Sequence, residues 1–468
     1  MTPCAAALDI AADVRGLRAT ATDIARDTLA RIAARDSRYN AFTAVTAARA
    51  LREAAAIDAA IAAGRDPGPL AGVPFAVKNL FDVKGHVTLA GSRINATNQA
   101  AAADATIVRR LCDAGAVLVG MLNMDEYAYG FTTENAHYGT TRNPHSLDCI
   151  AGGSSGGCGA AVAGGLVPLA LGSDTNGSIR VPSALCGIFG LKPTYGRLSR
   201  AGSFPFAGSL DHVGPFARTV PDLAAAYDAM QGPDERDPVC AARAVEPASY
   251  QLKLGAGGLR IGLLKGYFEQ NADVAAWEAV VAAARALGVT REIVLPEVER
   301  ARAAAFIITG LEGGQLHLPN LRDRRNEFDP LVRDRLTAGA LIPGAWYLQA
   351  QRLRRWFSLR VRETFREVDV LLAPATPRSA TAIGQETMCI RGREMLVRPN
   401  LGLLTQPLSF IGLPIVVAPL AVTARMPLGM QIIAPAWRED LCLRVAAALE
   451  QRGLAYAKTP VMAELATG

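Results

Sequence analysis

The residues best suited to chemistry lie in a short polar turn, SDTNGS at residues 173–178, which follows the apolar segment VPLALG. The apolar segment predicts a buried strand, and IRVPSALCG after the turn predicts a helix, so Ser178 is expected at a strand-to-helix junction. Consecutive backbone N–H groups at such a junction lack helical partners and can face one point. We therefore expect Ser178 to be a nucleophile, beside an oxyanion hole formed by the N–H groups of Thr175, Asn176, Gly177 and Ser178.

A serine hydroxyl is a weak nucleophile unless a base accepts its proton. Lys78 is the preferred candidate for this base, because it stands in the apolar strand segment PFAVKN, where burial would lower its pKa. The same pattern also fits an exposed lysine at a strand edge. Asp174 is close to the nucleophile but could equally cap the turn, and none of the five histidines stands in a recognised relation to Ser178.

The glycine-rich segment GGSSGG, residues 152–157, supplies two more hydroxyl groups. We expect Ser154 to pass a proton between Lys78 and Ser178, and Ser155 to support the lysine. A plain tight turn or a phosphate-binding loop is the alternative. The lysine that a phosphate-binding loop requires after its glycines is absent here, so we favour the proton relay.

The same segment also matches G-x-S-x-G, the nucleophile elbow of α/β-hydrolases. In that interpretation Ser154 is the nucleophile, and the acid and histidine come from Asp211 with His212 or His317. An elbow requires a strand directly before it, whereas RNPHSLDCIA contains a proline and several polar residues. The elbow also leaves Lys78 and the 173–178 turn without a role, so we favour the lysine-based site.

Several side chains near these segments are candidates for substrate contacts. Asn176 and Ser155 could hydrogen-bond a polar substrate, although asparagine is also common in turns. Arg180 could bind a carboxylate, and its alternative role, which we favour, is a structural ion pair with Asp174. Tyr127 could line the pocket together with Tyr129, or both could pack beneath it.

Composition narrows the class of protein. The chain has 468 residues, of which 50% are hydrophobic and 20% charged, which is enough for a large buried core. Its eight cysteines form no CxxC pair, and its histidines show no metal-ligand spacing, so we expect neither a disulfide framework nor a metal site. No secretory signal and no apolar run long enough to span a membrane is apparent, which favours a cytoplasmic protein without membrane contact.

Between residues 300 and 366 the chain is rich in arginine, and the net charge of the whole chain is +6. An anionic partner or nucleic acid would explain such a region. Acidic residues are interleaved with the arginines, however, and no pattern of stacking aromatic residues accompanies them. We therefore expect solvated helix faces and no nucleic-acid partner.

Predicted strands and helices alternate along most of the chain. This pattern indicates an α/β fold with a central, mixed and mostly buried β-sheet flanked by helices on both faces. We expect a single domain over residues 1–468. Its expected parts are N-terminal helices at 1–65, a core at 66–225, a subsidiary lobe at 226–400 and a return to the core sheet at 401–468.

These motifs resemble the amidase signature family over nearly the whole chain. The resemblance rests on AGVPFAVKNLFDVKG, GMLNMDEYAYGFTTENAHYGTTRNP, the 151–202 segment, DVLLAPATP and the C-terminal PLGMQIIAPAWREDLCLRVAAALEQ, in the family's order. Lys78, Ser154 and Ser178 also have the family's spacing. The resemblance implies a Ser-cisSer-Lys triad with a cis Gly153–Ser154 peptide bond. It further implies hydrolysis of an amide C–N bond through an acyl-enzyme on Ser178, without a cofactor.

Two positions depart from the common family pattern: Asn176 replaces a small residue and Asn79 replaces an aspartate. DTNGS and NMDEYAYGFTTENAHYG are most similar to the group that hydrolyses 1-carboxybiuret in the s-triazine and cyanuric acid route. This implies a small urea-like substrate, ammonia release, and a small accessory subunit like the amidotransferase C subunit, in a homodimer or heterotetramer. The alternatives are the glutaminase (A) component of a tRNA-dependent amidotransferase, an allophanate hydrolase, another small-amide amidase, or a non-catalytic binding module.

Overall fold

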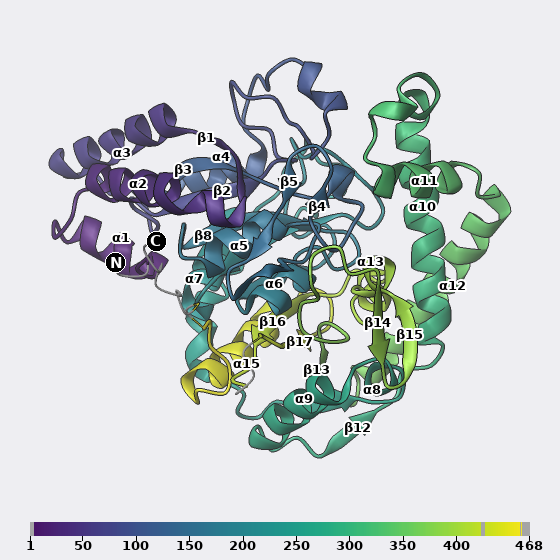
Figure 1. The fold of residues 1–468 in the computed structure, drawn as a ribbon. Helices are drawn as coiled ribbons and strands as arrows, with labels where there is room; N and C mark the ends of the chain where they lie inside the picture. The colour runs from purple at the N-terminus through teal and green to yellow at the C-terminus, as the bar shows by residue number, and fades with distance from the viewer. Residues whose placement is uncertain (1–3, 423–425, 459, 461–468) are drawn as a thin grey trace, which may run out of the picture.

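The computed structural model describes residues 4–422, 426–458 and 460, and an eleven-stranded β-sheet forms its centre (Figure 1). The strand order is β1-β3-β2-β8-β10-β9-β16-β17-β13-β11-β12. The strands are β1 (Phe42–Val45), β2 (Pro74–Lys78), β3 (Val117–Leu122), β8 (Leu169–Asp174), β9 (Phe189–Lys192), β10 (His212–Ala217), β11 (Ile261–Leu264), β12 (Arg291–Ile293), β13 (Val370–Pro374), β16 (Ile415–Pro419) and β17 (Gly429–Ile433). Strand β2 runs parallel to β3 and β8, and β11 runs parallel to β12 and β13, whereas the middle pairs are antiparallel. The sheet is therefore mixed, as predicted.

The middle strands are buried along their whole length, which explains why they read as continuous apolar runs. Helices cover both faces of these strands. One group is α5 (Gly156–Ala163) and α6 (Arg180–Cys186), and the other is α4 (Thr106–Asp113), α7 (Val220–Met230) and α15 (Glu439–Gln451). The predicted α/β architecture with helices on both faces is confirmed.

The N-terminal region contains the two expected helices, α2 (Ala21–Tyr39) and α3 (Ala47–Ala62), and also α1 (Ala7–Arg15). Helix α2 begins where the Thr20 side chain accepts a hydrogen bond from the Asp23 N–H, a typical N-cap. Between α2 and α3 lies the edge strand β1, which pairs antiparallel with β3. Strand β1 was not predicted from the sequence, because only a few residues separate α2 from α3.

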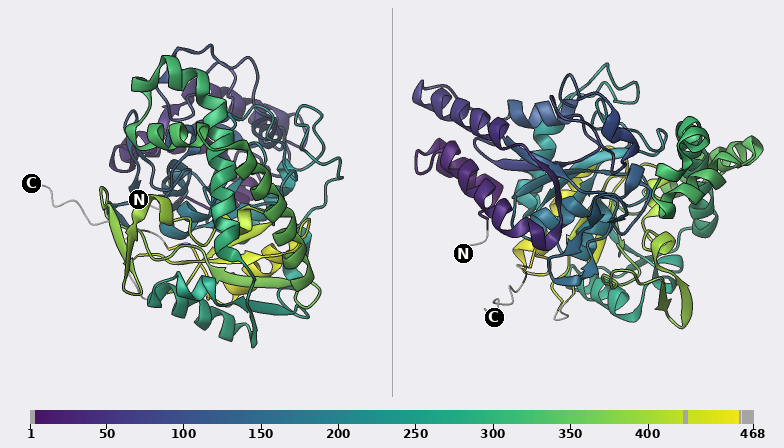
Figure 2. Two further views of the ribbon diagram at one scale, coloured as in Figure 1. Left: turned by 90° about the vertical axis from the view of Figure 1, so that its right-hand side faces the viewer. Right: turned by 45° about the horizontal axis from the view of Figure 1, so that its top comes forward.

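The arginine-rich region is helical, as expected, and forms α10 (Val298–Asp323), α11 (Pro330–Ala340) and α12 (Gly344–Thr364). These helices lie at the opposite end of the molecule from α1–α3 (Figure 2). Helices α10 and α11 approach each other through Gly310 and Gly339, where a Cβ on Gly339 would lie 2.0 Å from the Gly310 carbonyl oxygen. The close contact fixes α11 against α10.

The region 226–400 contributes β11, β12 and β13 to the central sheet. That this region forms a subsidiary lobe stays a prediction. Apart from the 13-residue helix α9, the remaining elements are short. They are the helices α8 (Tyr267–Gln270), α9 (Val274–Ala286), α13 (Val397–Asn400) and α14 (Gln406–Ser409), and the small strand pairs β4 (Glu134–Asn135) with β5 (Gly139–Thr140), β6 (Arg142–Asn143) with β7 (Ser146–Ile150), and β14 (Thr387–Ile390) with β15 (Arg393–Leu396). Among the described residues, no helix combines the length and the apolar character needed to cross a membrane.

Candidate active site

Lys78 is the last residue of β2, and its fully buried amine reaches two serine hydroxyls. Its Nζ donates to Ser154 Oγ at 2.6 Å and to Ser173 Oγ at 2.9 Å. The second contact follows from the parallel register, in which Val77 pairs with Leu171, so that the carboxyl ends of β2 and β8 meet at one edge of the sheet. The lysine is therefore interior, and the alternative of an exposed lysine at a strand edge is wrong.

Burial lowers the pKa of Lys78 to about 8, because a charged amine loses its solvation in the interior. Cys158 and the carboxylates of Asp125 and Asp174 partly offset this effect by favouring the ammonium form. A lysine with this pKa is partly neutral near physiological pH. It can therefore accept a proton from the hydroxyl that it contacts, as a general base must.

Ser154 lies in the loop between β7 and α5, and the Gly153–Ser154 peptide bond is cis, as the family resemblance implied. A Cβ at Gly153 would lie 2.1 Å from Asp125 Oδ2, so this position accepts only glycine. Asp125 is itself held by Arg398 Nη2 at 3.1 Å and by the Thr133 N–H at 3.0 Å. Its own N–H donates to the Ser154 carbonyl oxygen at 3.2 Å. Asp125 therefore anchors the loop that presents Ser154 to the lysine.

Ser155 does not contact the lysine directly. Its Oγ donates to the Ser173 carbonyl oxygen at 3.2 Å, and the Ser173 N–H donates back to Ser155 Oγ at 3.4 Å. The Ser155 N–H also donates to the Ser178 carbonyl oxygen at 3.3 Å. Ser155 thus joins the two serine-bearing loops and positions Ser173. It is fully buried and does not line the pocket described below, so the expected substrate contact by Ser155 is wrong.

Asp174 holds the turn of residues 173–178. Its Oδ1 accepts the Gly177 N–H at 2.7 Å, and its Oδ2 accepts the Ile179 N–H at 3.2 Å. Gly177 has a φ of 141°, and a Cβ there would lie 2.2 Å from Thr405 Oγ1, so the turn requires glycine. Because the Gly177 N–H is donated to Asp174, it is not free for an oxyanion. The expected set of four oxyanion-hole donors is therefore wrong for Gly177.

The N–H groups of Thr175, Asn176 and Ser178 find no protein acceptor within the described residues, and all three residues line the same pocket. They remain the predicted donors for an oxyanion. Among the residues that the structure describes, the hydroxyls of Ser154 and Ser178 are not hydrogen-bonded to each other. The proton relay between these two serines therefore stays a prediction, since such contacts often tighten only with substrate present.

Arg180 is a structural residue. Its Nε and Nη2 donate to the Asp174 carboxylate at 2.9 and 3.0 Å, and its Nη1 donates to the Thr405 carbonyl oxygen and Gln431 Oε1, both at 2.9 Å. Burial would raise the pKa of Asp174, but the Arg180 guanidinium outweighs this and holds that pKa well below its usual range. The ion pair is fully buried, which confirms the favoured structural role. The expected substrate contact by Arg180 is wrong.

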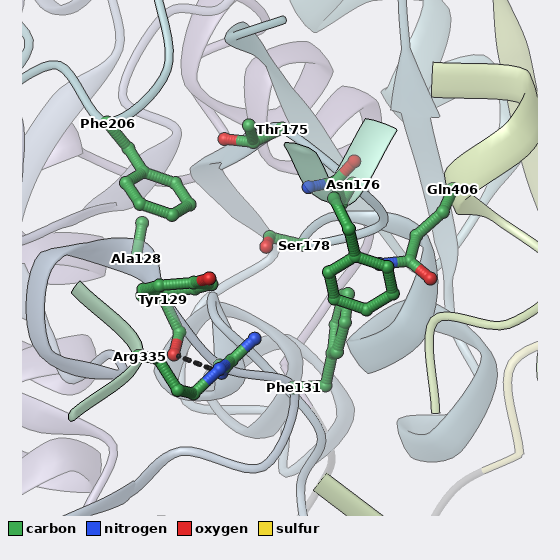
Figure 3. Close-up of a pocket in the computed structure, with 11 residues that line it drawn as sticks. Ala128, Tyr129, Phe131, Thr175, Asn176, Ser178, Phe206, Arg335 and Gln406 are labelled. Atoms are coloured by element: carbon green, nitrogen blue, oxygen red, sulfur yellow. Dashed lines mark hydrogen bonds between the residues drawn. The ribbon is translucent and has the colours of Figure 1, made fainter. Parts of the chain in front are cut away.

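Ser178 lines a small pocket (Figure 3). Aromatic side chains form much of its wall: Tyr129, Phe131, Phe206 and Phe306. The polar side chains that line it are Thr175, Asn176, Ser178, Arg335 and Gln406. The site thus combines one nucleophile, a small apolar enclosure and a few convergent polar groups, which is typical of a small-molecule site.

Arg335, on α11, is the cation of this pocket. Its Nη1 donates to the Tyr129 carbonyl oxygen at 3.0 Å, and its guanidinium carbon lies 3.8 Å from the centroid of the Tyr129 ring. Burial lowers the pKa of Arg335 below the usual arginine value. In the described part of the chain, no carboxylate lies within ion-pair distance of it. The guanidinium is therefore held in position with its charge available to a ligand.

Other arginines of the 300–366 region behave as expected. Arg324, Arg333 and Arg360 pair with acidic neighbours at the surface. The expectation of solvated faces is wrong for Arg335, Arg302 and Arg354. Arg335 lines the pocket, and Arg302 Nε donates to Gln406 Oε1 at 2.8 Å. Arg354 donates to the carbonyl oxygens of Phe410 and Ser209.

Tyr127 packs beneath the site and does not line the pocket. Its ring centroid lies 3.9 Å from that of His317, and its hydroxyl donates to Asn95 Oδ1 at 3.2 Å. The left-handed conformation of Tyr127, with φ of 51°, turns the chain so that Tyr129 faces Ser178 instead. The expected substrate contact of Tyr127 is wrong, and Tyr129 takes that position.

The hydrolase-elbow interpretation is also wrong. The strand before the glycine-rich loop, β7, pairs with β6 and forms an isolated bridge from Cys149 to Ala382, but it is not part of the central sheet. His212 Nδ1 lies 2.6 Å from the Leu210 carbonyl oxygen, and the Asp211 carboxylate accepts the Thr175 hydroxyl at 2.6 Å. His317 stacks on an aromatic cluster. None of these groups forms the acid–histidine pair that an elbow serine needs.

Three polar residues of the site were not predicted from the sequence: Ser173, Arg335 and Gln406. Ser173 had a usable signal, because it ends a predicted strand beside the strand that carries the lysine. Arg335 and Gln406 had none, since each lies more than 150 residues after Ser178 in segments without a motif. Only the packing of α10, α11 and α14 brings them to the nucleophile.

Known proteins share these features. The family model described as amidase matches residues 23–443. The chain is 56% identical over 443 residues to AtzE, a component of the 1-carboxybiuret hydrolase of Pseudomonas sp. (strain ADP), covering 94% of this chain and 97% of that protein. It is 39% identical over 475 residues to the A component of the glutamyl-tRNA(Gln) amidotransferase of Azotobacter vinelandii, covering 95% and 97%.

A solved structure also matches this chain with a TM-score of 0.96 and 54% identity, over 97% of this chain and all of the other. It is described as a vestigial protein complex that reveals the evolutionary origins of an s-triazine catabolic enzyme. The match to the family model and the high identities extend across the sheet, the glycine-rich loop and the Ser178 turn. The chain therefore belongs to the amidase signature family and is an amidase.

Proposed function

We propose that this amidase hydrolyses the terminal carbamoyl group of 1-carboxybiuret and releases ammonia through an acyl-enzyme on Ser178. The observation that carries the proposal is Arg335, a guanidinium without a carboxylate partner among the described residues, in the small pocket that Ser178 lines. The relative with 56% identity, which is named as part of a 1-carboxybiuret hydrolase, supports the same substrate.

The substrate has one carboxylate and one terminal carbamoyl group, and the pocket has a matching cation and nucleophile. A guanidinium can bind a carboxylate through two parallel hydrogen bonds. With the carboxylate on Arg335, the carbamoyl group is left for Ser178. The pocket that Ser178 lines has little free space, which favours a small substrate.

In the proposed reaction, neutral Lys78 takes the Ser154 proton while Ser154 takes the Ser178 proton. Ser178 Oγ then attacks the terminal carbamoyl carbon, and the backbone N–H groups beside it stabilise the oxyanion. Return of the proton through Ser154 to the leaving nitrogen breaks the C–N bond and releases ammonia. Water then hydrolyses the acyl-enzyme, which leaves a urea carboxylated on both nitrogens.

We further infer that the chain works with a small accessory subunit, in a homodimer or heterotetramer. Support comes from the solved relative with 54% identity, which is described as a protein complex. The glutaminase role remains a second candidate, because the A component of the amidotransferase covers almost the whole chain at 39% identity. Glutamine turnover separates the two functions.

The test is ammonia release by the purified chain, alone and with any small partner, from 1-carboxybiuret, biuret, malonamate and glutamine. Arg335→Gln should lower kcat/KM for 1-carboxybiuret by about 10- to 150-fold, because a hydrogen bond to a charged group contributes about 1.5–3 kcal/mol. For biuret, which lacks the carboxylate, we expect little change. Arg333→Gln, which removes a surface arginine of the same helix, is the matched control.

Ser178→Ala should abolish turnover of 1-carboxybiuret. Equal losses on biuret and 1-carboxybiuret in Arg335→Gln would contradict the carboxylate contact. Turnover of glutamine but not of 1-carboxybiuret would instead favour the amidotransferase role. Activity that survives Ser178→Ala but is lost in Ser154→Ala would overturn the assignment of the nucleophile.

A further inference from the structure

The wall of the pocket that contains Asn176 and Gln406 holds two amide side chains with incomplete hydrogen bonding. Gln406 is fully buried, and its Oε1 accepts from Arg302 Nε at 2.8 Å. Arginine has no acceptor, so this contact fixes the orientation of the Gln406 amide, with Nε2 directed away from Arg302. Gln406 Nε2 is buried and has no hydrogen-bond partner within the described residues.

Asn176 shows the complementary arrangement. Its Nδ2 donates to Thr309 Oγ1 at 2.8 Å, and its Oδ1 is buried without a partner in the part of the chain that the structure describes. Only 7% of Asn176 is exposed. An unpaired buried polar group costs about 1–3 kcal/mol, so two such groups in one small pocket point to a ligand that satisfies both.

Helix α10 holds both amides in place from one face. Arg302, Phe306 and Thr309 follow each other at intervals of four and three residues, so they project on the same side. Arg302 positions Gln406, Thr309 positions Asn176, and Phe306 lines the pocket between these helix positions. The two amides are therefore set by packing before any substrate arrives.

We propose that Asn176 and Gln406 are specificity-determining residues for a ureido substrate. Asn176 Oδ1 accepts a substrate N–H, and Gln406 Nε2 donates to a substrate C=O. In Figure 3, Asn176, Gln406, Tyr129 and Arg335 surround Ser178. A small substrate at Ser178 thus meets a cation, a hydrogen-bond acceptor and a hydrogen-bond donor in one pocket. The inference rests on the proposed function and adds the chemical feature that the pocket recognises.

The two residues make separable predictions for matched ligands. Allophanate and malonamate differ only in an N–H that is replaced by CH₂, and biuret and malonamide form the same pair without a charge. Asn176 acts on the N–H and should set the preference for the ureido member of each pair. Gln406 acts on a carbonyl that both members carry, and should therefore affect both members equally.

The experiment measures binding of both ligand pairs to the full chain carrying Ser178→Ala, by calorimetry, so that it does not depend on turnover. We expect this protein to bind the ureido member more tightly than the methylene member, by a factor of about ten or more. A site that hydrogen-bonds a substrate N–H rejects an analogue without it. Adding Asn176→Leu should bring the ratio close to one. Adding Gln406→Glu, which keeps the Arg302 contact but replaces the donor by an acceptor, should weaken both members about tenfold and leave the ratio unchanged.

Gln385→Glu, at an exposed glutamine, is the matched control and should change neither affinity. A wild-type ratio near one, a ratio unaffected by Asn176→Leu, or affinities unaffected by Gln406→Glu would overturn the inference. If the pattern holds but 1-carboxybiuret is not hydrolysed by the parent chain, the proposed substrate fails while the ureido preference stands. If 1-carboxybiuret is hydrolysed but Asn176→Leu does not change the affinity ratio, the proposed substrate stands and the role of Asn176 in ureido preference fails.

Discussion

Titration of Lys78 should control the rate of this enzyme between pH 6 and 9. The amine has no exposed surface, and burial lowers its pKa from 10.5 to about 8. At pH 7 about 9% of such a lysine is neutral, against about 0.03% for a solvated lysine, which is a gain of about 300-fold in the base form. Because only the neutral amine accepts a proton, kcat/KM should rise about tenfold per pH unit below 8 and level off above it.

The same shift affects stability with a defined sign. The pKa of Lys78 is lower in the folded than in the unfolded chain, so the folded state bears the cost of a buried charge below pH 8, about 3 kcal/mol for 2.5 pKa units. This cost disappears as the pH rises from about 8 to 10.5. Lys78→Met lacks the titrating group, so its stability relative to wild type should be greatest at neutral pH and fall over this range.

Two measurements test this account. Ammonia release from 1-carboxybiuret gives kcat/KM from pH 6 to 9.5, and denaturant unfolding of wild type and Lys78→Met gives the stability difference at pH 7 and pH 10. Lys78→Arg, which keeps a charge but stays protonated, should be inactive throughout. A rate that is constant across this range, or a stability difference that does not change with pH, would refute the role of a neutral buried lysine.

Three further outcomes follow from the geometry. Ser173→Ala removes a hydrogen-bond acceptor of Lys78, so kcat should fall about tenfold and the midpoint of the pH profile should move to lower pH; an unchanged midpoint would argue against this contact. Arg180→Met leaves Asp174 buried and unpaired and should lower the free energy of unfolding by about 3–5 kcal/mol, whereas a loss below about 1 kcal/mol in denaturant unfolding would be inconsistent with the ion pair. Tyr127→Phe should leave KM within about twofold of wild type, since this ring packs beneath the pocket, and a tenfold rise in KM would place it in contact with substrate.

The sequence by itself determined the class of fold and pointed to the proposed catalytic residues. Lys78, Ser154 and Ser178 each stand in a local pattern that specifies its own surroundings: an apolar strand, a glycine-rich loop and a strand-to-helix turn. Such patterns act over a few residues, where backbone preferences and the period of apolar residues decide the conformation. Alternating strands and helices similarly predicted the mixed sheet with helices on both faces.

Tertiary structure alone decided how the pocket is lined and which polar groups remain free. The arginine-rich region gave no sign that Arg335 faces the nucleophile, because a charge pattern along a helix does not say which neighbour covers each face. The choice between Tyr127 and Tyr129 depended on two consecutive residues with positive φ, Tyr127 and Ala128. The availability of the Gly177 N–H depended on a contact with the Asp174 side chain. Each of these outcomes depends on how the folded chain packs, so the sequence pattern of one segment cannot predict it.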